Sequence, residues 1–241
     1  MAIAMTDPAP MLDLTNVVMS YRIEGGIFTL LDIARLRIPG GRAVGLSGPS
    51  GSGKTTLLNL CAGLLQPTSG SIVVDGVEIT ALPQRVRDGF RTSRIGYVFQ
   101  GFNLIPALSA IGNVEIALRL AGQLSASERR SRARSLLARV GLGERLRHKP
   151  AQLSFGQMQR VGIARAIANR PRLILADEPT ASLEPVLARG IAQLLIDVAR
   201  SEGATLLVAT HDPGILAMMD EQIALADINR APGAPRGTIT P

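Results

Sequence analysis

The sequence predicts an α/β fold with a mainly parallel sheet, an antiparallel β subdomain and an inserted helical subdomain. Short apolar strands alternate with helical patterns, which is typical of a parallel sheet. Turn signals at Gly25-Gly26 and Asp75-Gly76 indicate antiparallel hairpins within residues 11–38 and 70–80. Residues from about 103 to 168 carry only helical patterns, which is long enough for an inserted lobe. The strands expected in the parallel sheet are residues 43–47, 95–99, 173–177, 204–210 and 222–226.

This pattern divides the chain into five segments. The two ends are rich in Pro, Ala, Gly and Thr, so we expect them to be loose tails. The segments are a flexible N-terminal tail (1–10), a core with the antiparallel β subdomain (11–102), a helical subdomain (103–168), the rest of the core (169–227) and a C-terminal tail (228–241).

Composition favours a cytosolic globular protein with an aliphatic core. Apolar residues make up 46% of the 241 residues, whereas aromatic residues make up only 3%. No apolar run approaches the roughly 18–20 residues that cross a bilayer, and residues 1–10 do not resemble a secretory signal. The single cysteine, Cys61, lies in an apolar helical pattern, and we interpret it as a small core residue.

The net charge of +7 comes almost entirely from arginine. A basic surface could serve nucleic acid, anionic lipid or a nucleotide. The densest arginine run, residues 129–134, follows Ser125-x-x-Glu128, which is a capping-box signature. We interpret the run as the solvated face of an amphipathic helix. No aromatic residues interleave with these arginines, so a nucleic-acid partner is not expected.

A glycine-rich loop between a predicted strand and a predicted helix matches the pattern G-x-x-x-x-G-K-[ST]. In such a loop, glycines let backbone N–H groups turn inward around phosphate oxygens, and the helix N-terminus adds its positive dipole. Lys54 is expected to reach the β- and γ-phosphates, and the Thr55 hydroxyl to bind Mg²⁺. The pattern predicts a P-loop nucleotide hydrolase core. Its phosphate-binding residues are Gly48, Pro49, Ser50, Gly51, Ser52, Gly53, Lys54, Thr55 and Thr56.

Two acids end the apolar strand over residues 173–177. Asp177 is the expected Mg²⁺ partner, either directly or through water. Glu178 stands one residue further on, where a carboxylate could orient and deprotonate an attacking water. His211 follows another strand, and ligands of such sheets bind at the carboxyl ends of strands, so we expect it to contact the γ-phosphate.

The segment Leu153-Ser154-Phe155-Gly156-Gln157-Met158-Gln159-Arg160 precedes the Asp-Glu strand end by about 20 residues. It resembles the signature of ATP-binding cassette (ABC) ATPases, usually written LSGGQ. Ser154, Gly156 and the start of a helix make a second anion site. The resemblance covers about residues 11–227 and looks closest to lipoprotein-release and macrolide-export-type ATPases.

The resemblance implies ATP and Mg²⁺ as ligands and assigns roles to further residues. Gln100 matches the family's Q-loop, and His211 matches its switch histidine. Tyr21 stands where the family stacks an aromatic ring on adenine. Catalysis would therefore fall to Glu178, His211 and Gln100, and metal binding to Thr55, Gln100 and Asp177. Ser154, Gly156 and Gln157 would bind the nucleotide through the signature.

In the family, the signature of one subunit closes on the nucleotide held by the P-loop of another. The resemblance thus implies a homodimer that sits on the cytoplasmic face of the membrane through integral permease subunits. The apolar residues Phe102, Leu104, Ile105 and Leu108 are expected to form the groove that receives a permease helix.

Two residues depart from the family pattern. Phe155 replaces the first glycine of the signature pair, and Glu184 replaces the usual Asp of the D-loop at residues 181–184. The effect of these two replacements on the rate of ATP hydrolysis cannot be read from the sequence. Two alternatives remain: a soluble ABC ATPase that acts on DNA or ribosomes, and a regulatory scaffold that binds ATP without hydrolysing it. The transported substrate and the direction of transport cannot be read from the sequence.

Overall fold

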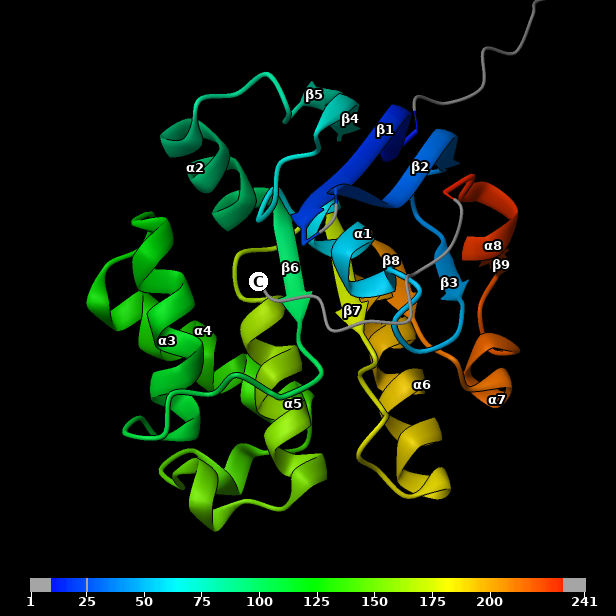
Figure 1. Cartoon of the computed structure of the whole chain (residues 1–241). Helices are drawn as coiled ribbons and strands as arrows, with labels where there is room; N and C mark the ends of the chain where they lie inside the picture. The colour runs from blue at the N-terminus through cyan, green and yellow to red at the C-terminus, as the bar shows by residue number, and fades with distance from the viewer. Residues whose placement is uncertain (1–9, 25, 232–241) are drawn as a thin grey trace, which may run out of the picture.

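The computed structural model describes residues 10–24 and 26–231, and its centre is a five-stranded parallel sheet (Figure 1). The strand order is β6-β7-β8-β3-β9, and every pairing in this sheet is parallel. The predicted fold class is confirmed. The strands are β3 (Ala43–Ser47), β6 (Ile95–Val98), β7 (Leu173–Asp177), β8 (Thr205–Ala209) and β9 (Glu221–Ala224).

The second sheet is antiparallel, with the strand order β2-β1-β4-β5. Its strands β1 (Leu12–Ile23), β2 (Gly26–Ile38), β4 (Ser69–Val74) and β5 (Val77–Glu78) form the two predicted hairpins. Gly25 lies outside the described residues. The register between β1 and β2 shifts at Met19/Ser20, where Leu30 is the extra residue on β2. Such a bulge redirects a side chain and increases the local twist.

The helical subdomain fills the interval between β6 and β7. It consists of α3 (Ala110–Ala121), α4 (Ala126–Arg139), two 3₁₀ turns at 143–145 and 150–152, and α5 (Phe155–Ala166). The predicted capping box begins α4, because the Ser125 hydroxyl accepts from Glu128 N while the Glu128 carboxylate accepts from Ser125 N. The other helices are α1 (Lys54–Cys61), α2 (Gln84–Arg94), α6 (Pro185–Glu202), α7 (Pro213–Leu216) and α8 (Leu225–Ile228).

Alternating residues of the parallel sheet enter two separate cores. On β7, Leu173 and Leu175 pack with α1 and the antiparallel sheet, whereas Ile174 and Ala176 pack with the helical subdomain and α6. Both faces are therefore covered, which explains why the strand has no polar side until it reaches Asp177. Cys61 is buried in the first of these cores, as predicted, and burial raises the pKa of its thiol to about 12.

The chain end differs from the predicted tail. Residues 225–228 form α8 rather than the end of a strand, and the described residues after it are attached to β2. The Asn229 amide accepts from Asp32 N at 2.8 Å and donates to Leu30 O at 3.0 Å. The expectation of a loose tail is therefore wrong for residues 228–231, because the Asn229 side chain satisfies two backbone groups of β2. The rest of that tail, and residues 1–9, lie outside the described residues.

Candidate functional site

The glycine-rich loop connects the end of β3 to the start of α1, as predicted. Gly51 and Gly53 have φ values of 76° and 104°, in the left-handed region that favours glycine. A Cβ atom on Gly53 would also lie 2.9 Å from the Leu31 side chain. These glycines let the loop wrap around the N-terminus of α1, where free N–H groups and the helix dipole favour an anion.

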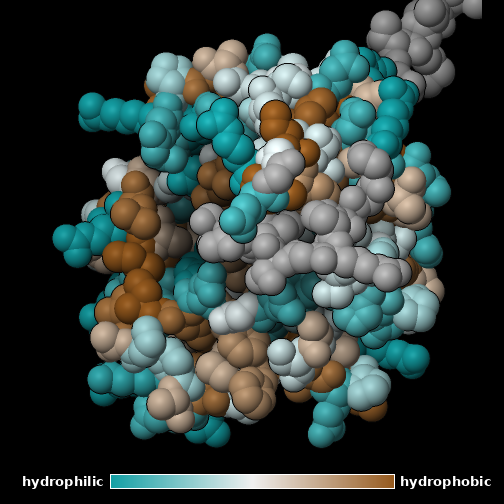
Figure 2. Space-filling model, in the orientation of Figure 1, coloured by the Kyte–Doolittle hydropathy of each residue, from teal (hydrophilic) through white to brown (hydrophobic). Residues whose placement is uncertain are grey.

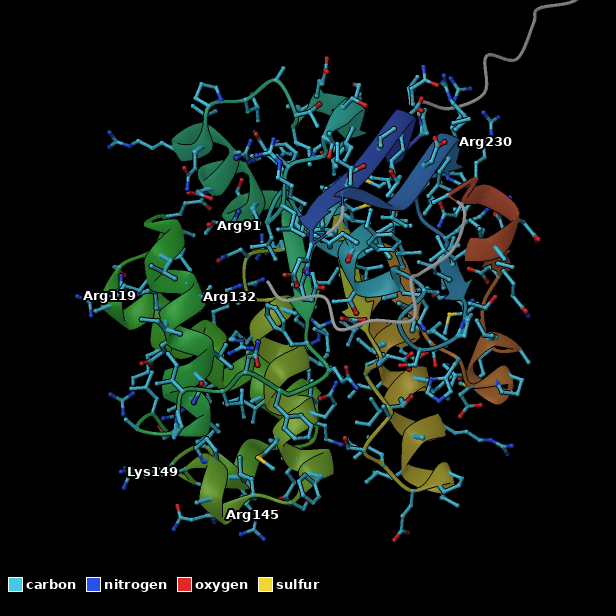
Figure 3. The ribbon with its side chains drawn as sticks, viewed as in Figure 1. Arg91, Arg119, Arg132, Arg145, Lys149 and Arg230 are labelled. Atoms are coloured by element: carbon cyan, nitrogen blue, oxygen red, sulfur yellow. The ribbon has the colours of Figure 1, made fainter. Side chains whose placement is uncertain are left out.

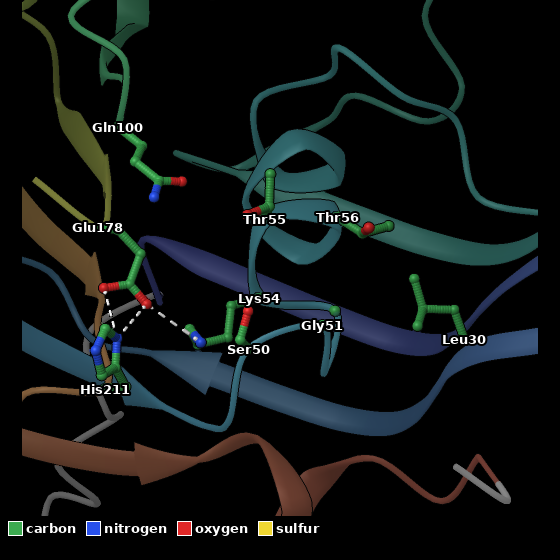
Figure 4. Close-up of a pocket in the computed structure, with 10 residues that line it drawn as sticks. Leu30, Ser50, Gly51, Lys54, Thr55, Thr56, Gln100, Glu178 and His211 are labelled. Atoms are coloured by element: carbon green, nitrogen blue, oxygen red, sulfur yellow. Dashed lines mark hydrogen bonds and ion pairs between the residues drawn. The ribbon is translucent and has the colours of Figure 1, made fainter. Parts of the chain in front are cut away.

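Lys54 is the first residue of α1, and its side chain is 6% exposed. Nζ donates to Gly48 O at 2.7 Å and Pro49 O at 3.1 Å, and it lies 3.3 Å from Glu178 Oε1. The Glu178 carboxylate also meets His211 Nδ1 at 3.0 and 3.1 Å (Figure 4). Residues from the P-loop, the end of β7 and the end of β8 therefore meet around one carboxylate.

The adjacent acids Asp177 and Glu178 face different partners. Asp177 ends β7, and its Oδ1 accepts from the Thr55 hydroxyl at 3.1 Å. Glu178 has a φ of 43°, a left-handed conformation that is uncommon for a residue with a side chain. This turn directs the second carboxylate toward Lys54 instead. Burial raises the pKa of the Asp177 carboxyl, and the hydrogen bond from Thr55 partly offsets that effect.

These residues surround a cavity of about 310 Å³. Its lining brings together most of the predicted site: Ser50, Gly51, Gly53, Lys54, Thr55, Thr56, Gln100, Glu178 and His211. In Figure 4, Gln100 and His211 lie on either side of Glu178. Leu30 also lines the cavity, and sequence reasoning missed it. No sequence signal marks Leu30, since it reaches the P-loop only through the bulge in β2.

Tyr21 does not line this cavity. It lies on β1 opposite Phe28 and packs, partly buried, against the core beneath the antiparallel sheet. The contact between Tyr21 and adenine therefore stays a prediction. Leu30, which does line the cavity, is a second apolar residue that could contact the base.

The signature forms the capped N-terminal end of α5. Ser154 is the N-cap of α5, where its hydroxyl accepts from Gln157 N at 3.3 Å and the Gln157 amide accepts from Ser154 N at 3.0 Å. Gly156 is buried, and a Cβ there would lie 2.8 Å from Leu187 on α6. Ser154, Gly156 and Gln157 are all missing from the lining of the P-loop cavity. Within the described chain, the two predicted nucleotide-binding elements are thus apart.

A P-loop at the end of the parallel strand β3, with Asp and Glu at the end of β7 in the same sheet, defines a P-loop nucleotide hydrolase. The family model described as "ABC transporter" matches residues 31–181. The chain belongs to the ABC transporter family and is an ATP-binding, ATP-hydrolysing subunit of such a transporter.

Curated relatives and solved structures agree with this assignment. The chain is 42% identical to the lipoprotein-releasing system ATP-binding protein LolD 2 of Caulobacter vibrioides, a match that covers 90% of this chain and 95% of the relative. It is 43% identical to LolD of Hyphomonas neptunium, with the same coverage. A dimeric post-hydrolysis structure of the ATP-binding cassette MJ0796, bound to ADP and Pi, matches with a TM-score of 0.82 and 41% identity, over 89% of this chain and 94% of that one. These relatives give no support to an ABC ATPase that acts on DNA or ribosomes.

Proposed function

We propose that two copies of this chain enclose two ATP molecules, each held by the P-loop of one copy and the signature of the other. The observation that carries the proposal is the separation of these two elements within the chain. The P-loop cavity holds Lys54, Thr55, Gln100, Glu178 and His211, yet the capped end of α5 lies outside it. A two-fold axis places the same surface of both copies face to face, so it completes both sites at once.

The P-loop fits the polyphosphate of ATP. The Ser52 hydroxyl is buried without a hydrogen-bond partner, and a Cβ on Gly48 would lie only 2.8 Å from it. A buried polar group without a partner is costly, so a phosphate oxygen at this place would stabilise the loop. The γ-phosphate would compete with Glu178 for the Lys54 ammonium.

Thr55 and Asp177 also fit Mg²⁺. This ion takes few protein ligands and keeps waters and substrate phosphates as the others, so one hydroxyl and one carboxylate are sufficient. The described residues contain no cluster of three or more acidic, His or Cys side chains, which agrees with such a sparse site. The ion would neutralise charge on the phosphates, while Gln100 lies near enough to line the same space.

We assign the general base to Glu178 and the γ-phosphate contact to His211. In the described arrangement, Lys54 and His211 both bind the Glu178 carboxylate. Transfer of Lys54 to a bound phosphate would free Glu178 to take a proton from the attacking water, with His211 turning toward the phosphate.

An apolar groove offers a place for a membrane partner. A cavity of about 260 Å³ opens between α2, β6 and α3, and its apolar lining includes Leu64, Tyr97, Phe99 and Leu120. Leu120 is 73% exposed, and Figure 2 shows a hydrophobic band on the flank where Figure 1 places α3. The expected groove residues, Phe102, Leu104, Ile105 and Leu108, do not line this cavity, so their contact with a permease helix stays a prediction. They follow Gln100 into a segment that Asn113 holds against the helical subdomain.

No helix among the described residues is long and apolar enough to cross a bilayer. From the similarity to LolD we infer that the chain sits on the cytoplasmic face of the membrane through permease subunits that occupy this groove. The similarity to LolD favours a transporter that releases lipoproteins or related lipid-anchored cargo.

Cross-linking between chains tests the two-fold site. One variant carries Ser50→Cys in the P-loop and another carries Gln157→Cys in the signature, and Cys61 is buried and gives little background. With Glu178→Gln added to both to prevent hydrolysis, a short bis-maleimide should join the mixed variants only when ATP and Mg²⁺ are present. A doubly substituted chain that cross-links within itself, or a mixture that does not cross-link, would contradict the proposal.

A further inference from the structure

Phe155 begins α5, and its side chain is 61% exposed. Its ring lies over that of Phe102, with the ring centroids 6.1 Å apart and an angle of 29° between the planes. This separation is within the range at which aromatic pairs attract each other beyond simple burial. The contact thus joins the first residue of the signature helix to the segment that follows Gln100.

The Phe102 segment is itself held in an uncommon conformation. Phe102 and Asn103 have φ values of 57° and 46°, both in the left-handed region. Their carbonyl oxygens accept from the Arg165 guanidinium, which lies near the other end of α5. Two consecutive left-handed residues with side chains need such external bonds to persist. Arg165 therefore fixes Phe102 in the place where Phe155 meets it.

Ile105, three residues after Phe102, is also held in place by side-chain hydrogen bonds. The Asn113 amide is fully buried, accepts from Ile105 N at 2.7 Å and donates to Ile105 O at 3.2 Å. Phe102 thus sits between Gln100, which reaches the nucleotide cavity, and a segment anchored to α3. A displacement of Gln100 would therefore also displace Phe102, because the short segment between Gln100 and Ile105 is held too firmly to deform.

The other flank of the signature turn is also packed. Gly156 lies so close to α6 that a Cβ there would be 2.8 Å from Leu187. The first turn of α5 is therefore placed between Leu187 and Phe102. The family's usual glycine in place of Phe155 has no side chain, so it could not make the contact with Phe102.

We propose that Phe155 is a positioning residue, which ties the signature end of its own chain to the Gln100 segment through Phe102. The inference rests on the proposed two-fold site. In that arrangement, Gln100 senses the nucleotide of one site, while Ser154 and Gly156 serve the nucleotide of the other. Contact between the two rings then couples the position of Gln100 in one ATP site to the position of the signature in the other site.

A double-mutant cycle tests the link. Phe155→Gly and Phe102→Leu should each lower kcat of the intact chain by about two- to tenfold, the range that corresponds to one aromatic pair. The double variant should lose no more than either single variant, because both remove the same contact. Phe155→Tyr keeps the ring and should retain wild-type kcat. Multiplicative losses, or an unchanged kcat in Phe155→Gly, would overturn the proposal.

Two further measurements separate this link from folding and from the proposed function. ¹⁹F NMR of the chain labelled with 4-fluorophenylalanine gives one resonance for each of its five phenylalanines. Without nucleotide, Phe102→Leu should shift the Phe155 resonance, whereas Phe90→Leu on α2 should not. ATP affinity of the monomeric chain should be the same for all variants and the wild type, because neither Phe102 nor Phe155 lines the P-loop cavity. A wild type that neither binds nor hydrolyses ATP would refute the proposed function itself, whereas a Phe155 resonance insensitive to Phe102→Leu would refute only the link.

Discussion

Lys54 Nζ lies 3.3 Å from Glu178 Oε1, in an ion pair whose side chains are 6% and 12% exposed. The group that should hold phosphate is thus paired with the acid that should activate water. Opposite charges this close attract strongly when water is largely excluded. A bound γ-phosphate must therefore displace Glu178 from Lys54, which would activate the base only when its substrate is present.

Lys54→Ala should abolish ATP binding, because the phosphates lose the only lysine of the P-loop. Hydrogen bonds from a charged donor are each worth about 1.5–3 kcal/mol, and the β- and γ-phosphates would lose more than one. Equilibrium binding of a fluorescent ATP analogue measures the effect. Lys149→Ala, at the only other lysine in the sequence, is the matched control. Lys149 is exposed on the helical subdomain, where Figure 3 shows it far from the P-loop. Normal binding by Lys54→Ala would refute the phosphate site.

Tyr21→Ala should weaken ATP binding modestly and leave kcat unchanged. Stacking of a base on an aromatic ring is worth about 1–3 kcal/mol in nucleic-acid systems, and the low end is expected on a partly exposed strand. Leu30→Ala provides the comparison, since Leu30 lines the cavity and Tyr21 does not. If only Leu30→Ala changes the Kd for ATP, adenine lies against Leu30 and Tyr21 is an ordinary strand residue.

Leu120→Asp should prevent assembly with the permease subunits while ATP binding by the free chain stays normal. Leu120 is exposed in the groove, so the new charge is tolerated in the isolated chain but costly once a partner covers it. Co-purification with the permease subunits measures the loss. Ile27→Asp is the control, because Ile27 is similarly exposed, at 76%, on the β1–β2 hairpin. Equal yields of complex from both variants would place the partner elsewhere.

Cys61 should resist thiol reagents in the folded chain. Burial raises its pKa to about 12, so the folded chain holds almost no reactive thiolate at pH 8, whereas an exposed thiol with a pKa of about 8.5 would be partly ionised. Labelling with iodoacetamide, followed by mass spectrometry, should show modification only after denaturant is added. Rapid labelling of the native chain would mean that the α1 core opens readily.

Much of the fold could be predicted because local patterns coincide with the packing. The strand over residues 173–177 is wholly apolar because both of its faces are buried, and the capping box at Ser125 marks the start of α4 by local chemistry alone. The end of the chain was harder to predict. Asn229 is attached to β2, nearly 200 residues away in sequence, and no local pattern reports such a contact.

The candidate site likewise has a part that could be predicted from the sequence and a part that could not. The P-loop, Asp177 and Glu178 are recognisable because phosphate and metal chemistry require particular residue types at fixed spacing. Leu30 and the Phe102–Phe155 contact depend on a bulge and on left-handed backbone, which only the folded chain shows. The groove at Leu120 was missed for a similar reason, since its lining also brings in residues as far apart in sequence as Leu64 and Asn169.

Glu178→Gln tests the central claim, that two copies close on ATP and reopen by hydrolysis at Glu178. The change keeps the shape of the side chain and one acceptor oxygen but removes the carboxylate that we propose takes a proton from water. Lys54, Thr55 and Asp177 stay in place, so ATP and Mg²⁺ should still bind. Size-exclusion chromatography and phosphate release should be measured on the same samples. We expect a dimer with ATP, a monomer with ADP, and almost no phosphate release. Wild-type turnover by Glu178→Gln, or loss of turnover without an ATP-dependent dimer, would contradict the account.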